Sequence, residues 1–414
     1  MSPGQSLGQP LNALIVHEGE GAQDAVPIND HIFMSRGISN CYLVTTPDGD
    51  VQVNTGIHWE AAEIKRRFER VSAGPLRVIV FTQGHSDHVG GWSLFDAPGV
   101  ETIAQANHAV VREYWRRLQP FFSRRTEKLW GRDITNVDRS FQPPEPVVTT
   151  TFLDRHAFSV GGRHFELYGT PGGETTDSLI VWLPEERTLF TGNLMGPLFG
   201  HVPNLYTVRG DKIRSAIGFI HSLDRVIALE PELLITGHGE PISGSAEIRR
   251  RITRVRDATE YLRDRTIEGM NAGADLWMLM GQISLPPALD IPQGHGKVPW
   301  IVRAIWEEHA GWFRYESTTE LYDVPPSAIW GELIELAGGP APLVQRARRH
   351  LSAGRPLEAL HYLDVVLAKN PADRDALHVK LDALELLLER SGRENFSEVR
   401  WLEAEIAETN TALS

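Results

Sequence analysis

Short apolar runs alternate with amphipathic segments over residues 28–240. The runs are β-branched or alternate with polar residues, which is typical of strands, and they lie at residues 38–44, 51–53, 78–81, 164–168, 178–183, 187–191 and 233–236. Between them, Ile64, Phe68 and Val71 recur at helical spacing within residues 59–71, and a further helix is expected at about 210–223. Strand–helix alternation of this kind predicts an α/β layered fold.

The hydrophobic pattern becomes purely helical from Ser245 onward. One long amphipathic helix is expected at 246–271, a Pro- and Gly-rich loop at 285–299 and a second helix at 300–313. Three more helices are expected at 342–353, 356–369 and 372–390, separated by short Gly, Asn and Pro breaks. They resemble a tetratricopeptide-like helix pair, which is too short to be an array. The change of pattern predicts a domain boundary between residues 244 and 245.

Composition and charge exclude several classes of function. A formal net charge of −13 and the lack of a Lys/Arg block argue against binding of nucleic acid. No apolar run is long enough for a membrane span, and the polar, Gly-rich residues 1–22 do not resemble a secretory signal. The single cysteine, Cys41, rules out an internal disulfide and a thiolate metal site. These observations favour a cytoplasmic protein.

Candidate metal ligands gather directly after the predicted strand at 78–81. His85, Asp87 and His88 fall within four residues, and Gly90 and Gly91 follow them. A loop with so many candidate ligands could supply ligands to two adjacent cations. The competing interpretation is a polar loop that happens to contain two histidines, and Gln83 stands where a third histidine would be expected.

This segment resembles the His-x-His-x-Asp-His signature of the metallo-β-lactamase fold superfamily, with Gln83 in place of the first His. Within that superfamily the chain is similar to the alkylsulfatase branch. Glu174 follows Thr-Pro-Gly, Asn204-Leu-Tyr-Thr-Val-Arg-Gly210 matches a sulfate-contacting segment, and residues 296–313 and 333–339 look like the branch's dimerisation region.

The resemblance implies an αββα metallo-β-lactamase-like sandwich followed by an all-α dimerisation domain. Residues 1–244 would form the catalytic domain, and residues 245–414 the helical dimerisation domain with its tetratricopeptide-like pairs. The branch's further sterol-carrier-like domain, thought to present long alkyl chains, has no counterpart in this sequence.

The resemblance also implies two ligand sets. Gln83, His85 and Glu174 would hold one metal, and Asp87, His88 and His238 the other. Asn193 stands where the superfamily has a bridging acid. Zinc accepts such nitrogen and oxygen ligands, so the expected cofactor is one or two zinc ions or another divalent metal.

Two amides in these sets lower the expected affinity for a second metal. Gln83 is a neutral, weaker ligand, and Asn193 removes a negative charge from between two dications. A third amide, Asn54, stands where the superfamily often has an Asp that supports the metal loop, and a structural role is expected for it.

The function implied is hydrolysis of a small-molecule sulfate ester by metal-activated water. Arg209 would grip the sulfate through its bidentate fork, Asn204 would donate a hydrogen bond, and Asp87 would act at the metal. The alternatives are a carboxylic ester, lactone or thioester hydrolase on the same site, and a catalytically degenerate scaffold.

The helical region is expected to build a homodimer. It carries an aromatic group that includes Trp300, Trp306, Trp312 and Phe313, and aromatic residues are enriched at interfaces. The alternative is that these aromatics pack against the α/β domain of the same chain.

Overall fold

The computed structural model describes residues 24–130, 141, 143–211 and 214–414. The described residues fall into two compact units. The first comprises residues up to Ser123 and those from 141 to Glu308, and the second comprises residues 124–130 and His309–Ser414. Helix α4 (His108–Trp130) contributes to both.

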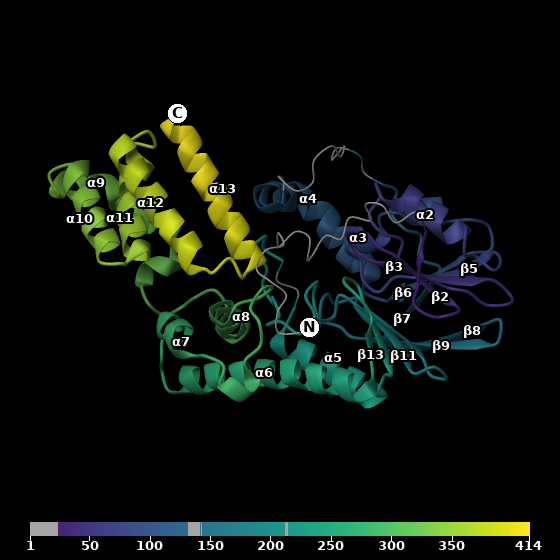
Figure 1. The fold of residues 1–414 in the computed structure, drawn as a ribbon. Coiled ribbons are helices and arrows are strands. Elements are labelled where there is room, and N and C mark those ends of the chain that lie inside the picture. The colour runs from purple at the N-terminus through teal and green to yellow at the C-terminus, as the bar shows by residue number, and fades with distance from the viewer. Residues whose placement is uncertain (1–23, 131–140, 142, 212–213) are drawn as a thin grey trace. The chain divides into compact units, whose positions relative to one another are not determined.

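The first unit contains a seven-stranded sheet whose strands follow one another in chain order (Figure 1). The strands β1 to β4 pair antiparallel, and β4 to β7 pair parallel. Their bounds are Val26–Pro27, Ile32–Ser35, Cys41–Val44, Asp50–Val53, Leu76–Val80, Glu101–Gln105 and Thr150–Phe152. The parallel strands bring the residues that follow β4 and β5 to the same edge of the sheet.

A six-stranded sheet with the order β13-β12-β11-β10-β9-β8 packs against the first. Its pairs are antiparallel except β11 with β12, which is parallel. In chain order from β8 to β13, the bounds are Arg155–Val160, Arg163–Gly169, Leu179–Leu183, Thr188–Gly192, Leu233–Thr236 and Ile242–Ser243.

Side-chain alternation along the strands builds three apolar layers. In β10, Val181 joins Val80 and Phe190 in the core between the sheets, whereas Ile180 and Trp182 join the layer on the outer face. Such alternation follows from the two-residue period of a strand. Both faces of each central strand are therefore buried, which explains their nearly continuous apolar sequences.

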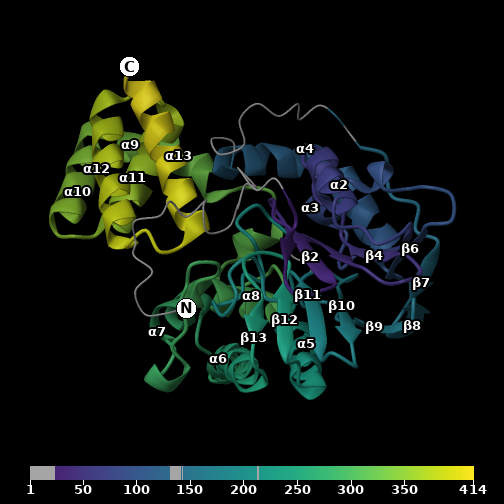
Figure 2. The ribbon, with the colours of Figure 1, turned by 45° about the vertical axis from the view of Figure 1, so that its right-hand side comes forward.

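Helices cover the two outer faces (Figure 2). Helices α2 (Ala61–Glu69) and α3 (Ser86–Val89) pack on the first sheet through residues such as Ile64 and Val89. The helices α5, α6, α7 and α8 pack on the second sheet, and their bounds are Ala216–Leu229, Ser245–Asn271, Leu276–Gln282 and Val298–Ala310. This arrangement is the expected αββα sandwich.

The second unit is helical, as the pattern after Ser245 predicts. Helices α9 to α13 have the bounds Trp330–Leu336, Pro340–Ser352, Pro356–Lys369, Arg374–Arg390 and Phe396–Leu413. Ala347, Ala359, Leu363 and Val366 are almost completely buried where α10, α11 and α12 meet. The boundary predicted between residues 244 and 245 stays a prediction, because α6 and α8 share an apolar layer with β10 in the first unit.

Among the described residues, none of the helices combines the length and the hydropathy that crossing a membrane requires.

Candidate metal centre

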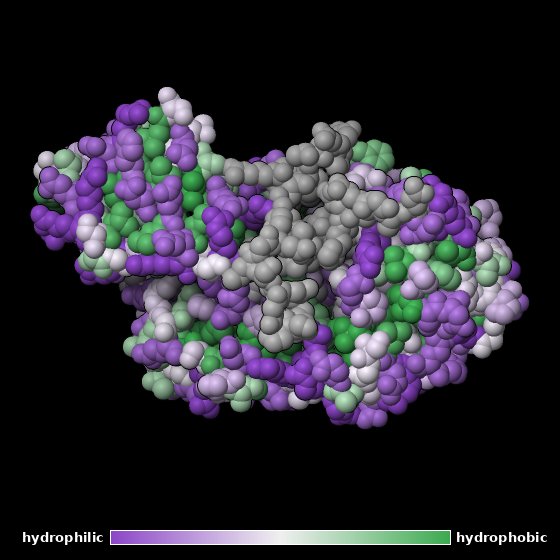
Figure 3. Space-filling view, in the orientation of Figure 1, coloured by the Kyte–Doolittle hydropathy of each residue, from purple (hydrophilic) through white to green (hydrophobic). Residues whose placement is uncertain are grey.

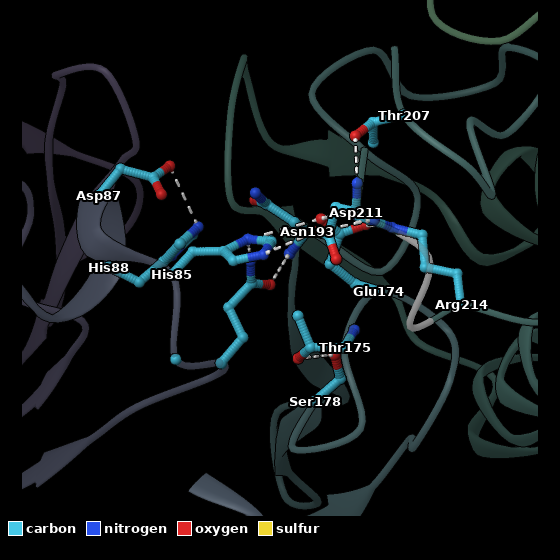
Figure 4. Close-up of polar contacts among 12 residues, drawn as sticks. His85, Asp87, His88, Glu174, Thr175, Ser178, Asn193, Thr207, Asp211 and Arg214 are labelled. Atoms are coloured by element: carbon cyan, nitrogen blue, oxygen red, sulfur yellow. Dashed lines mark hydrogen bonds and ion pairs between the residues drawn. The ribbon is translucent and has the colours of Figure 1, made fainter. Parts of the chain in front are cut away.

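The predicted ligands lie on loops that leave the ends of strands in the first unit. Gln83 and His85 follow β5, Asn193 follows β11 and His238 follows β12. Glu174 lies in the loop between β9 and β10. The fold thus assembles side chains that are up to 155 positions apart in the sequence, as Figure 4 shows for most of them.

Close packing holds the loop after β5 in place. His85 precedes α3 in an extended conformation, so that Asp87 and His88 lie within this short helix. A Cβ atom on Gly90 would lie 2.6 Å from the Ser86 carbonyl oxygen, and one on Gly91 would lie 2.3 Å from the Thr55 carbonyl oxygen. These glycines are needed because the backbone approaches closely at these points.

Asp87, His88 and His238 form a compact group. The Oδ2 atom of Asp87 lies 3.4 Å from Nε2 of His88 and 3.8 Å from Nε2 of His238. The three ligand atoms all lie within 4.8 Å of one another, and no other group of His, Cys, Asp or Glu among the described residues does so. The two predicted imidazole ligands therefore face the same carboxylate.

His88 is suited to metal binding by its protonation state. Burial lowers the pKa of its imidazole to about 4, so the ring is neutral at pH 7. Within the described part of the chain its buried Nε2 atom has no hydrogen-bond partner. A neutral imidazole with an unused ring nitrogen beside a carboxylate fits a divalent ion.

Asn54 contacts the other nitrogen of the same ring. Its Nδ2 atom lies 2.9 Å from Nδ1 of His88, and its Oδ1 atom accepts a hydrogen bond from the Thr82 amide at 3.0 Å. Asn54 adopts a left-handed conformation with φ of 63° in the turn after β4. The structural role expected for Asn54 therefore includes direct support of a predicted ligand.

The other predicted ligands form a second group around His85. The Nε2 atom of Gln83 lies 2.7 Å from Nδ1 of His85, and the Gln83 side-chain oxygen accepts a hydrogen bond from the backbone N–H of Asn193 at 3.3 Å. Oε1 of Glu174 lies 3.6 Å from Nδ1 of His85. The structure thus brings these four side chains together, and it adds two charged partners.

Arg214 and Asp211 are these charged partners, and neither was predicted from the sequence. Arg214 donates to the two oxygens of Glu174 at 2.5 and 2.9 Å, and its Nη1 lies 3.2 Å from Oδ2 of Asp211. The same Asp211 oxygen lies 3.6 Å from Nε2 of His85. The only sequence signal was an acid and an arginine three positions apart, just before the Ser215 cap of α5.

The electrostatics of this cluster are set by the guanidinium. Burial is the largest single effect and raises the pKa of the Glu174 and Asp211 carboxyls, but Arg214, His85 and other nearby groups together bring both pKa values below their usual range. Burial also opposes the charge on Arg214, yet the two carboxylates raise its pKa. All three groups are therefore ionised at neutral pH.

The two predicted sulfate contacts lie on the long loop between β11 and α5. Asn204 is buried, and Arg209 is partly buried with its Nη2 3.8 Å from Oδ2 of Asp211. Among the described residues, Oδ1 of Asn204 and Nε of Arg209 have no hydrogen-bond partner. The guanidinium of Arg209 lies over the ring of Trp115 on α4, at 5.1 Å from the ring centroid.

Two known families match parts of the chain. Residues 34–238 match the metallo-beta-lactamase superfamily, and residues 279–402 match the family described as alkyl sulfatase dimerisation.

Several curated proteins are similar to the chain. A linear primary-alkylsulfatase of Pseudomonas sp. (strain ATCC 19151) is 26% identical over 332 residues, which are 72% of this chain and 60% of that protein. The alkyl/aryl-sulfatase BDS1 of Saccharomyces cerevisiae is 21% identical over 394 residues, 87% of this chain and 60% of that protein. The chain thus spans about 60% of the length of these relatives.

The fold is also similar to a solved structure. The stereoselective inverting sec-alkylsulfatase Pisa1 from Pseudomonas sp. aligns with a TM-score of 0.80 at 20% identity, over 94% of this chain and 65% of that one. This likeness shows a shared fold. The chain joins a domain of the metallo-beta-lactamase superfamily to an alkyl sulfatase dimerisation domain.

Proposed function

We propose that the chain is a metal-dependent hydrolase of small-molecule sulfate esters, with residues 1–244 as its catalytic domain. The observation that carries the proposal is the group of Asp87, His88 and His238, whose ligand atoms lie within 4.8 Å of one another. The similarity to proteins named alkylsulfatases supports the sulfate ester as substrate class.

Asp87, His88 and His238 would hold a divalent ion, and zinc suits their nitrogen and oxygen atoms. Such an ion lowers the pKa of a water molecule that it binds, and so makes a nucleophile available near neutral pH. The burial of the two imidazoles supports this assignment, because a water-poor site strengthens electrostatic attraction to a cation.

Arg209 and Asn204 would bind the sulfate group. A guanidinium offers several N–H donors in a plane and can contact two sulfate oxygens at once. Trp115 lies against Arg209 and would fix the plane of the guanidinium and exclude water from one side of it. Asn204 would add one amide donor, and its buried position supports a role in orientation.

A panel of substrates tests the reaction class. We expect zinc-loaded protein to release inorganic sulfate from alkyl or aryl sulfates, and to act more weakly on matched carboxylic esters, lactones and thioesters. If the protein preferred carboxylic esters, lactones or thioesters, it would be a hydrolase of that substrate and not a sulfatase. Purified protein that binds no transition metal would contradict both enzyme proposals and favour the degenerate scaffold that Gln83 and Asn193 suggest.

We further propose that the helical region, residues 245–414, forms a homodimer. Trp306 is buried in the first unit's apolar layer, whereas Trp312 is 72% exposed, so only part of the aromatic group is available to a partner. Large exposed apolar side chains continue after it, and they are Tyr315, Leu321, Tyr322, Val324, Ile329, Leu333 and Leu336. Hydrophobic surface is visible among the hydrophilic side chains of this unit in Figure 3.

So many exposed apolar residues within one short segment are typical of an interface.

The cytoplasmic location expected from the composition stays a prediction.

A further inference from the structure

We propose that the chain binds a single divalent ion, at Asp87, His88 and His238, and that the Arg214 guanidinium replaces a second cation beside Glu174. The proposal rests on the metal-dependent function above and concerns how many ions that function uses. Figure 4 shows Asp87 and His88 on one side of His85, and Glu174, Asp211 and Arg214 on the other.

Glu174 is already fully engaged by a cation. Both of its oxygens accept hydrogen bonds from Arg214, at 2.5 and 2.9 Å, in a bidentate arrangement. All of these groups are buried. A metal ion that took Glu174 as a ligand would have to compete with this pair, and would leave a guanidinium buried without its partner.

The charges around His85 are balanced without a metal. The two carboxylates of Glu174 and Asp211 face the two guanidinium groups of Arg214 and Arg209. The remaining donors, Gln83 and Asn193, are neutral amides. A dication placed here would add two positive charges to a buried site that has no negative charge left to offset them.

The ring nitrogen of His85 that lies nearest to Glu174 is already in contact with another side chain. This atom, Nδ1, is in hydrogen-bond contact with Nε2 of Gln83 at 2.7 Å. The Gln83 side-chain oxygen, which would be the ligand atom, instead accepts a hydrogen bond from the backbone N–H of Asn193. Gln83, His85 and Glu174 therefore do not fit a metal ion.

Asp87 has the opposite environment. Within the described part of the chain its ion-pair partners are His88 and His238, and no Arg or Lys side chain pairs with it. Among the described residues, the Asp87 carboxylate thus lacks a guanidinium or ammonium partner like the one that Glu174 has in Arg214. This difference between the two groups is what assigns one ion to Asp87 and none to Glu174.

Two matched alanine variants test the place and number of ions. We would measure zinc content by inductively coupled plasma mass spectrometry, and thermal unfolding with and without added zinc, for the wild type, His85→Ala and His88→Ala. We expect one zinc per chain in the wild type and in His85→Ala, and loss of zinc in His88→Ala. Added zinc should raise Tm only in the two proteins that bind it.

The outcomes separate this inference from the proposed function. Two zinc ions per wild-type chain, or equal loss of zinc in both variants, would overturn the inference and leave the hydrolase proposal standing. No zinc in any of the three proteins would overturn both.

A second pair of variants tests Arg214. We expect Gln83→His alone to keep one ion, because Glu174 is still bound by the guanidinium. Gln83→His combined with Arg214→Gln should gain a second ion, since the carboxylate is released and an imidazole is added. A second ion in the single variant, or its absence in a folded double variant, would contradict the role given to Arg214. If the double variant does not fold, the two alanine variants still decide the number of ions.

Discussion

Asn54 is not a proposed metal ligand, but it contacts one, His88. A histidine that binds metal through Nε2 carries its proton on Nδ1 and needs an acceptor there. Asn54 instead places its amide nitrogen 2.9 Å from Nδ1 of His88, while its oxygen is used by the Thr82 amide. A carboxylate in this position could accept from both groups.

We therefore predict that Asn54→Asp tightens binding of zinc by about tenfold or more, the range typical of such supporting residues. Competition titration with a chromophoric chelator would measure the zinc affinity. Asn54→Ala is the matched control, which adds no acceptor and should not tighten zinc binding, and equal zinc affinity of Asn54→Asp and the wild type would exclude a supporting role for residue 54.

Arg209 offers a test of substrate recognition. We predict that Arg209→Ala lowers kcat/KM for the best sulfate ester at least about tenfold, because hydrogen bonds to charged groups contribute ~1.5–3 kcal/mol. Arg209→Lys should recover only part of the lost kcat/KM, since an ammonium cannot form the bidentate contact. Steady-state kinetics at matched zinc content would measure both, and an unchanged kcat/KM in the alanine variant would rule out the sulfate contact.

Asp211 links the cluster to pH-dependent stability. Its pKa is lowered in the folded state, because Arg214, His85 and Arg209 together outweigh the effect of burial. A lowered pKa contributes stability that is complete above the unfolded-state pKa of about 3.9, and that is lost as the pH falls below it.

We predict that Asp211→Asn lowers the free energy of unfolding by about 3 kcal/mol at pH 7, as expected when a buried charge loses a partner. The difference from the wild type should shrink as the pH falls below about 4. Urea unfolding at several pH values would measure it, and a difference that is constant from pH 7 to pH 3 would contradict the assignment.

At the scale of elements, the helices of the second unit depend on a small apolar core. Leu363 on α11 is completely buried among α10, α11 and α12. We predict that Leu363→Ala lowers the free energy of unfolding of this unit by about 2–5 kcal/mol. Leu357, which lies on the same helix and is 59% exposed, provides the control Leu357→Ala with little effect. Urea unfolding followed by circular dichroism would compare them, and equal effects would argue against this core.

Most central elements were predictable because their patterns are local. The strands at 78–81 and 187–191 differ by only a few residues from β5 and β11. By contrast, β8 was missed because its side chains are exposed or only partly buried, which leaves no apolar run. Helix α4 was missed as well, and it carries Pro120 and many charged residues. The helix expected at 210–223 begins only at Ala216, after the Ser215 cap.

At the scale of the whole molecule, the exposed apolar segment in the second unit predicts self-association. Leu336 at the end of α9 is 84% exposed, and it lies within the region that matches the dimerisation family. We predict that Leu336→Glu weakens a dimer that light scattering detects in the wild type, because a charge would be buried at the interface. Leu153→Glu, at a residue in the first unit that is 73% exposed, should leave the mass unchanged. A wild-type monomer at all concentrations would contradict the proposal.

The sequence by itself placed the candidate ligands of one loop directly after a strand. His85, Asp87 and His88 fall within four residues, and the apolar run before them specifies a strand through local periodicity. Local periodicity predicted an α/β layered fold, and the resemblance of the motifs implied its αββα arrangement.

Only the tertiary structure decided which charges meet. Arg214 lies forty positions after Glu174, in a loop without a periodic pattern, and contacts it directly. No local rule therefore relates the two residues. The partner of a buried carboxylate is selected by the cost of leaving its charge uncompensated, and that cost depends on the surroundings that folding creates. For the same reason, Gln83 stood out in the sequence, but its contact with His85 became visible only in the folded chain.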